Sequence, residues 1–171
     1  RRVGVSRPLA TAVALLSLLA LLSACSAPKP APIVVGEDLC AFCEMQVSDP
    51  RFPAQVVTKT GKAYKFDAVE CMVAFLAEGR VPADQVHSLW VTAFDEPGKL
   101  IRAEEARYLR SPELRSPMGL NVAAFRTLED LEGVRSEVGG VEVRWDDLHL
   151  LVLESGLTSM AHGHDMHDEA R

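Results

Sequence analysis

The chain has 171 residues, of which 18 are basic and 24 are acidic, so its formal net charge is −6 at pH 7. This length fits one compact unit or two very small ones, and it excludes a large multidomain protein. The chain is acidic overall and contains no run of Lys or Arg, so the sequence argues against a nucleic-acid partner. Its one long apolar stretch lies near the N-terminus, which excludes a membrane protein with several spans.

The first 24 residues have the pattern of a bacterial lipoprotein signal peptide. Basic residues precede an apolar run over residues 9–22, which is short for a bilayer span, and small residues come directly before Cys25. We therefore predict a signal peptide over residues 1–24, a lipidated Cys25 and a Pro-rich tether over residues 25–32. The lipid would anchor the protein on the extracytoplasmic face of a membrane, which is the periplasmic side of the outer membrane in a Gram-negative cell. An ordinary secretory signal and a retained membrane anchor are the alternatives.

The sequence from residue 33 to residue 94 predicts a first β-β-α-β unit. Two runs of β-type composition, 54–60 and 62–66, are separated by Thr60-Gly61, which is typical of a hairpin. Residues 86–94 return to β character after a helical segment.

The helical segment has an amphipathic pattern. Apolar residues at positions 69, 72, 73 and 76 follow the spacing of one helix face, and Gly79 ends the pattern. Asp67 followed by Glu70 is a capping signal, so we interpret Asp67 first as a helix cap and second as a possible oxygen ligand. This places Cys71 in the first turn and Met72 on the apolar face, in the core.

Residues 95–156 predict a second, looser β-β-α-β unit. Its elements are a strand near 100–102, a polar loop with two Ser-Pro pairs, a strand at 121–125, a helix after the capping signal Thr127-x-x-Asp130, a strand at 141–145 and a last helix capped by Asp146. The expected fold class is therefore α+β, with two small units in succession.

Sulfur-bearing side chains gather in three places and point to a soft metal ion. Cys40, Cys43 and Met45 lie close together, Cys71 follows at the predicted start of the helix, and Met118 lies in a Ser-Pro-Met-Gly loop. Thiolates and thioethers select Cu(I), whereas carboxylate and carbonyl oxygens select Mg²⁺ or Ca²⁺. If the segment is extended, Cys43 and Met45 point the same way and form half of a site.

The hairpin would return the chain so that Cys71 approaches Cys40 and Cys43. The helix N-terminus favours the metal-binding thiolate form of Cys71. Alternatives remain for these cysteines, because two thiols in an oxidising compartment can form a redox dithiol or a structural disulfide. The absence of a helical pattern directly after Cys40-x-x-Cys43 counts against a thioredoxin-type site.

The C-terminal residues 157–171 are polar and rich in His, and we expect them to be disordered. His162, His164, Met166 and His167 would form a weak secondary metal site, because imidazole binds Cu²⁺, Zn²⁺ and Ni²⁺. A solvated tail without a metal is the alternative.

Together, these motifs resemble the NosL family over roughly residues 25 to 150. The resemblance implies a lipoprotein that is a copper chaperone for nitrous oxide reductase, and hence a role in denitrification. It implies a Cu(I) carrier that works with an ABC-type transporter complex at the membrane, and a fold related to organomercurial lyase. The motifs that carry it are, in order, Cys25, Cys40-x-x-Cys43-x-Met45, Phe66-Asp67 with Cys71-Met72, and Ser116-Pro-Met118-Gly119 with Ala124-Phe125.

The same resemblance implies that Cys43 and Met118 bind copper, with Met45 in the same motif. This chain departs from the family at Glu44, where glycine is usual and would permit a positive φ. The first half also resembles the YHS/TRASH type of heavy-metal module, whose pattern has a Cys where this chain has Asp67. That second resemblance implies a zinc-like structural site with one oxygen ligand.

The sequence leads to the hypothesis of a membrane-tethered, extracytoplasmic Cu(I) chaperone that is not an enzyme. Cys43 would supply a thiolate, Met118 and Met45 would supply thioethers, and Cys40 or Cys71 would take part or protect the site. Two alternatives stay open. One is a thiol-disulfide oxidoreductase that keeps a partner's cysteines reduced, and the other is a heavy-metal-binding lipoprotein stabilised by zinc.

Overall fold

The computed structural model describes residues 27–160. Several predictions concern residues outside this range, namely the signal peptide, the lipidation of Cys25 and the secondary ligands His162, His164, Met166 and His167. Within the described range, no helix is both long enough and apolar enough to cross a membrane.

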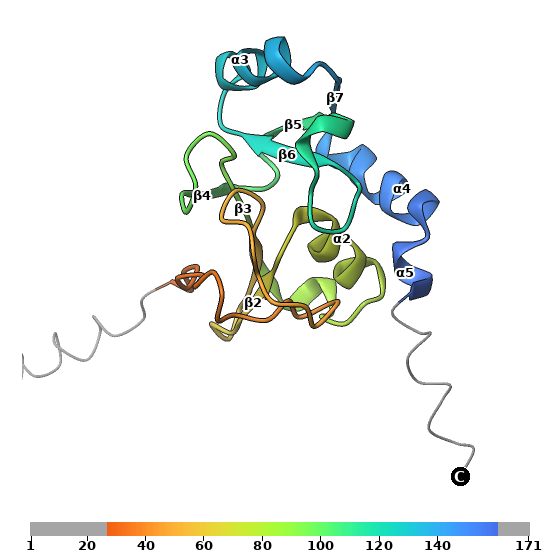
Figure 1. The fold of residues 1–171 in the computed structure, drawn as a ribbon. Coiled ribbons are helices and arrows are strands. Elements are labelled where there is room, and N and C mark those ends of the chain that lie inside the picture. The colour runs from red at the N-terminus through yellow and green to blue at the C-terminus, as the bar shows by residue number, and fades with distance from the viewer. Residues whose placement is uncertain (1–26, 161–171) are drawn as a thin grey trace, which may run out of the picture.

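The first half of the chain forms a four-stranded antiparallel sheet in the order β2-β1-β3-β4 (Figure 1). The predicted hairpin between the first two strands is confirmed. Gly61 in its turn has a φ of 86°, which a residue without Cβ adopts at little cost. The strands are β1 (Ala54–Thr58), β2 (Ala63–Phe66), β3 (Val86–Thr92) and β4 (Leu100–Arg102).

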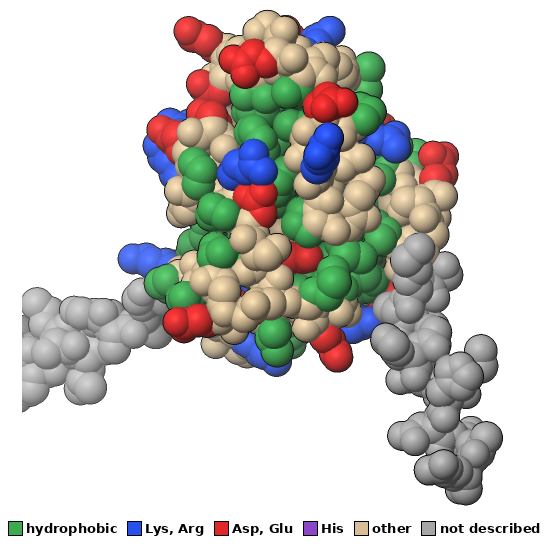
Figure 2. Space-filling view, in the orientation of Figure 1, with side chains coloured by type: hydrophobic (Ala, Val, Ile, Leu, Met, Phe, Trp, Pro, Cys, Tyr) green, Lys and Arg blue, Asp and Glu red, His purple; other side chains and the backbone are tan. Residues whose placement is uncertain are grey.

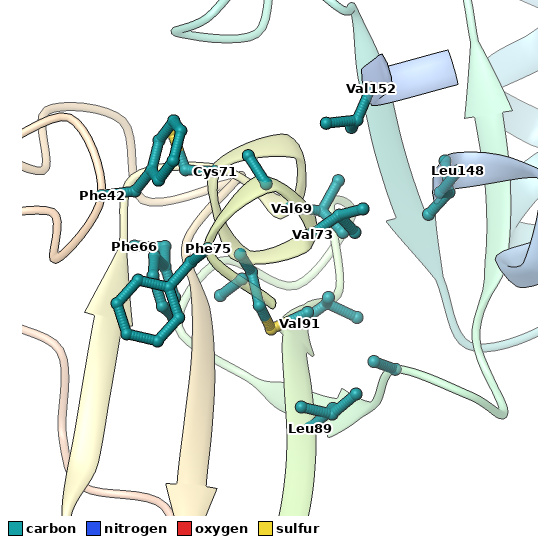
Figure 3. Packing of buried hydrophobic residues seen from close by; sticks show 14 of the residues in the cluster. Phe42, Phe66, Val69, Cys71, Val73, Phe75, Leu89, Val91, Leu148 and Val152 are labelled. Carbon is teal, nitrogen blue, oxygen red and sulfur yellow. The ribbon is translucent and has the colours of Figure 1, made fainter. Parts of the chain in front are cut away.

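Helix α2 (Val69–Ala77) packs on this sheet and is buried along most of its length. On one side, the Phe75 ring lies 5.1 Å from the Phe66 ring, measured between centroids. On another side, Val69 and Val73 point toward a helix from the C-terminal part of the chain (Figure 3). Because both sides are covered, α2 is held firmly at the centre of the fold.

The second half forms a three-stranded antiparallel sheet in the order β6-β5-β7, with α3 packed against it (Figure 1). Two further helices, α4 and α5, pack against α2 and cover its outer side. The elements are β5 (Arg107–Arg110), β6 (Val122–Phe125), α3 (Leu128–Val138), β7 (Val141–Val143), α4 (Trp145–Ser155) and α5 (Leu157–Met160), and short 3₁₀ helices lie at Ala83–Gln85 and Pro112–Leu114.

The two sheets meet where β3 ends. The Phe94 amide donates a hydrogen bond to the Ala124 carbonyl of β6 (2.8 Å), and Ala93 forms a parallel bridge with the same residue. The Phe94 ring lies 5.4 Å from the Phe52 ring and 5.7 Å from the Phe125 ring. The apolar core therefore continues from one unit into the other.

This architecture confirms the predicted α+β fold, but one strand belongs to a different sheet from the one predicted. The strand at residues 100–102, expected in the second unit, pairs with β3 and completes the first sheet. Its expected place is taken by β5, which the sequence analysis did not predict. Tyr108 and Leu109 of β5 are both buried, so the strand lacks the alternating pattern that identifies a half-buried strand.

The helix boundaries show where local sequence signals succeed and where they fail. The predicted Thr127–Asp130 capping box is present at the start of α3. Asp146, by contrast, lies in the first turn of α4, and Arg144 occupies the cap position. The segment expected to be disordered begins with α5, because Leu157 is buried against the other helices.

Charges are interspersed over the face shown in Figure 2, with hydrophobic side chains between them. Basic side chains do not gather into one stripe on this face. An exposed ion pair such as Lys99–Glu96 (2.6 Å) contributes little to stability, because water screens both partners.

Candidate metal centre

The loop before β1 contains a tight turn that holds two cysteines. The Cys40 amide donates a hydrogen bond to the Met45 carbonyl (2.8 Å), which closes the turn around Cys43. The turn is fastened to β2, because the Ala41 amide donates to the Lys65 carbonyl (2.8 Å). Both cysteines are therefore positioned by hydrogen bonds of the backbone.

Glu44 forms the corner of this turn, with a φ of 61° in the left-handed region. The segment is not extended, so the prediction that Cys43 and Met45 point the same way as alternate residues of a strand is wrong. Cys43 is half-buried, whereas 47% of the Met45 side chain is exposed. The assignment of Met45 as a ligand stays a prediction. The positive φ also gives a physical reason for a glycine at this position.

Three cysteines and one aspartate converge at the start of α2. Their ligand atoms all lie within 4.8 Å of one another, and all three thiols are free. The turn supplies two thiols, the residue after β2 supplies the carboxylate, and the first turn of α2 supplies the third thiol. The gathering that the hairpin predicts is thus present, and the residues are Cys40, Cys43, Asp67 and Cys71.

Asp67 is not the helix cap that the sequence suggested. The N-cap of α2 is Ala68, and no side chain caps this helix. The Asp67 carboxyl is 1% exposed and turns into the thiol cluster, with Oδ2 lying 3.9 Å from Cys43 Sγ. Within the described structure, its Oδ1 has no hydrogen-bond partner. A buried oxygen without a partner costs about 1–3 kcal/mol, which a bound metal ion would offset.

The cluster distributes its protons unequally. Hydrogen bonds from the Cys40 and Cys71 thiols lower the pKa of Cys43 to about 4, so this thiol is a thiolate at neutral pH. Hydrogen bonds with Cys40 and Cys43, together with burial, raise the pKa of Cys71. Burial in the cluster raises the pKa of Asp67 to about 6. The half-exposed Cys43 is therefore the ionised sulfur of the group.

Apolar side chains close the inner side of the cluster. Cys71 of α2 and Phe42 are both buried and belong to the main core, and they lie next to each other in Figure 3. The Arg80 guanidinium stacks over the Phe42 ring at 5.0 Å and covers it from solvent. Cys43 is thus the open side of the site, while Cys40 and Cys71 are its buried side.

Met118 comes from the other half of the protein. It is half-buried and packs against the core cluster that contains Cys40 and Cys71. Its role as a ligand stays a prediction, but its loop adjoins the unit that carries the thiols. Met72 of α2 is fully buried in the core, as its place on the apolar face predicts.

Sequence reasoning missed one buried polar group beside the site. Glu70 does not complete a capping box with Asp67; its carboxyl is 0% exposed and accepts a hydrogen bond from Ser116 Oγ. No sequence signal connects these two residues, which lie 46 positions apart. The D-x-x-E spacing favoured a local partner, whereas tertiary structure supplied a distant one.

The fold and the thiol cluster together describe a small α+β protein with a candidate site for a soft metal ion. The NosL family model matches residues 32–152, and the chain belongs to the NosL family.

Two relatives have names that describe a copper-binding protein and a copper chaperone rather than an enzyme. The copper-binding lipoprotein NosL of Stutzerimonas stutzeri is 29% identical over 139 residues, covering 78% of this chain and 72% of the relative. The crystal structure of the copper chaperone NosL from Shewanella denitrificans matches with a TM-score of 0.59 and 23% identity. That match covers 70% of this chain and 96% of the other, and it shows that the fold is shared.

The low pKa of Cys43 predicts an unusual alkylation profile. In the metal-free protein, the rate of Cys43 alkylation by iodoacetamide should rise through a midpoint near pH 4 and stay level above pH 6, because the reactive thiolate is already formed. Peptide mass spectrometry identifies the modified residue. In denaturant, the same thiol should follow the ordinary midpoint near pH ~8.5. A rate in the folded protein that keeps rising to pH 8 would contradict the assignment.

The left-handed backbone at Glu44 predicts a stabilising substitution. Glu44→Gly should raise the free energy of unfolding by about 0.5–1 kcal/mol, because the removal of strain exceeds the extra chain entropy of glycine. Denaturant unfolding of the metal-free protein measures it. The matched control is Glu37→Gly, which lies in the same exposed loop but has no positive φ. It should lower the free energy of unfolding by about 0.5–1 kcal/mol. Equal losses in the two variants would show that Glu44 carries no strain.

Proposed function

We propose that this protein is a Cu(I) chaperone, with Cys43 as the principal ligand. The observation that carries the proposal is the gathering of three free thiols, one of them a half-exposed thiolate, within 4.8 Å. Met118 and Met45 supply thioethers, and Cys40 or Cys71 completes or protects the site. Asp67 would supply a secondary oxygen ligand.

The donor set favours Cu(I) over harder ions. Thiolate and thioether sulfurs are soft donors, and Cu(I) is stable with only two or three of them. A hard ion such as Mg²⁺ or Ca²⁺ requires six or more oxygens, and this cluster offers one carboxylate. A thioether also stays available at any pH near neutrality, because it is not protonated.

The exposed side of the site suits transfer by ligand exchange. A sulfur or nitrogen of the acceptor binds the ion next to Cys43 before the bond to the Cys43 sulfur breaks, and the ion remains Cu(I) throughout. A low coordination number leaves room for the incoming ligand. Cys40 and Cys71 are buried, so the acceptor does not contact them during this step.

For the acceptor, we propose the assembly route of nitrous oxide reductase. The NosL resemblance supports this route, in which an ABC-type transporter complex at the membrane takes part in building the copper cluster. The protein would then act in denitrification, on the extracytoplasmic side of the membrane.

The lipid anchor would keep the site close to the membrane. Both hydrogen bonds between the Gln55 amide and the Ala31 backbone, 2.7 and 2.9 Å, fasten the end of the predicted tether to β1. Only six peptide units separate Cys25 from Ala31, so the tether reaches at most about 20 Å. A copper carrier held within this distance meets membrane-bound partners rather than distant ones.

Copper affinity should depend on Cys43 and Met118. Titration of the metal-free protein against a coloured Cu(I) chelator should show a loss of about 100-fold or more for Cys43→Ser and about tenfold for Met118→Leu, because each variant removes one sulfur ligand. Met72→Leu is the matched control. It removes an equivalent thioether from the core next to Cys71, and it should change affinity by less than about threefold.

Variants of Cys43 and Met118 that bind as tightly as the parent would refute the ligand assignment. If the parent instead purifies with tightly held zinc, or forms mixed disulfides with partner thiols more readily than it binds copper, then a structural zinc protein or an oxidoreductase is the better description.

The anchor is tested in cells. Cys25→Ser should move the protein from the membrane fraction to the soluble extracytoplasmic fraction, because the lipid accounts for its attachment. Metabolic labelling with a fatty acid should mark the parent and not the variant. Retention of the variant in the membrane at the parent's level would contradict lipid anchoring through Cys25.

A further inference from the structure

A buried hydrogen bond joins the two segments that carry sulfur donors. Ser116 Oγ donates to Glu70 Oε1, although the two residues belong to different halves of the chain. Glu70 directly precedes Cys71 on α2, and Ser116 lies two residues before Met118. The hydrogen bond therefore connects the thiol side of the site with the thioether side.

Ser116 also organises the loop that carries Met118. The Asn121 amide donates to Ser116 Oγ (2.8 Å), and the Ser116 amide donates to Asn121 Oδ1 (3.1 Å). The Gly119 amide donates to the Ser116 carbonyl (3.0 Å), which closes a turn around Met118. The Ser116 hydroxyl thus accepts a hydrogen bond from the loop and donates one to Glu70, so the bond to Glu70 fixes the whole loop.

Stability alone does not explain a carboxyl group at position 70. The Glu70 side chain is fully buried, and Oε2 has no hydrogen-bond partner in the part of the chain that the structure describes. A buried carboxyl with an unpartnered oxygen stabilises a fold less than an apolar side chain of the same size. What this arrangement adds is a fixed distance between α2 and the Met118 loop.

The geometry points to Glu70 as a positioning residue that acts through Ser116 to hold the Met118 thioether beside the Cys71 thiol. This inference rests on the proposed Cu(I) binding and goes beyond it, because Glu70 belongs to neither the ligand set nor the thiol cluster. A ligand that is already in place binds more tightly than one whose loop must be ordered at the moment of binding.

A first test uses the full-length protein without copper. With methionine labelled by ¹³C at its methyl group, Ser116→Ala should shift and narrow the Met118 signal, because the loop gains motion, and should leave the Met72 signal in place. Assignment follows from Met118→Leu and Met72→Leu. An unchanged Met118 signal in Ser116→Ala would overturn the inference, whatever the protein does with copper.

A second test is a double-mutant cycle on Cu(I) affinity, measured with the competing chelator. Ser116→Ala should weaken binding about tenfold in the parent but less than about twofold in a Met118→Leu background, because the thioether is then already absent. Glu70→Gln keeps the acceptor for Ser116 and should bind within about threefold of the parent. X-ray absorption should show one sulfur neighbour fewer in Ser116→Ala.

The outcomes separate this inference from the proposed function. A parent that binds Cu(I) no better than Cys43→Ser overturns the proposed function. A parent that binds well, with equal losses from Ser116→Ala in both backgrounds, overturns the positioning role alone and leaves copper binding intact. If Ser116→Ala does not fold, Glu70→Leu fills the same volume without an acceptor, and the same cycle applies to it.

Discussion

The candidate site depends on how polar groups are buried at the entry to α2. Asp67 and Glu70 are carboxyl groups almost without exposure, and each has an oxygen without a hydrogen-bond partner among the described residues. A helix start surrounded by apolar side chains would ordinarily exclude both. Their presence is intelligible if the first turn of α2 serves as the junction of a site, with Asp67 turned toward the thiols and Glu70 turned toward the second unit.

Under the proposed assignment of Met118 as a ligand, this junction brings both halves of the protein to one site. The turn around Cys43 is fastened to β2, Cys71 is fixed by α2, and Met118 belongs to a loop of the second unit. Hydrogen bonds and core packing hold each segment separately. The three thiols can therefore be close without the disulfides that would remove them from use, and one of them is ionised and half-exposed.

Periodicity and turn chemistry predicted much of this fold. The hairpin at Gly61, helix α2 and the Thr127 capping box all arise from local sequence, so local rules suffice for them. Strand β5 was missed because Tyr108 and Leu109 are both buried, and sheet membership of β4 depends on a long-range pairing that no local pattern encodes. The sequence indicated which cysteines gather, but the capping interpretation of Asp67 and Glu70 failed because distant partners compete with local ones.

The bridge between Ala93 and Ala124 bears on the history of such a chain. If two similar units arose by duplication, their present contact has removed the independence that duplicated modules begin with. The Phe94 ring of the first unit is packed on Phe125 of the second, and the C-terminal helices cover α2. A chain cut between the two units would leave apolar surface uncovered on each of them, so we expect neither unit to fold alone.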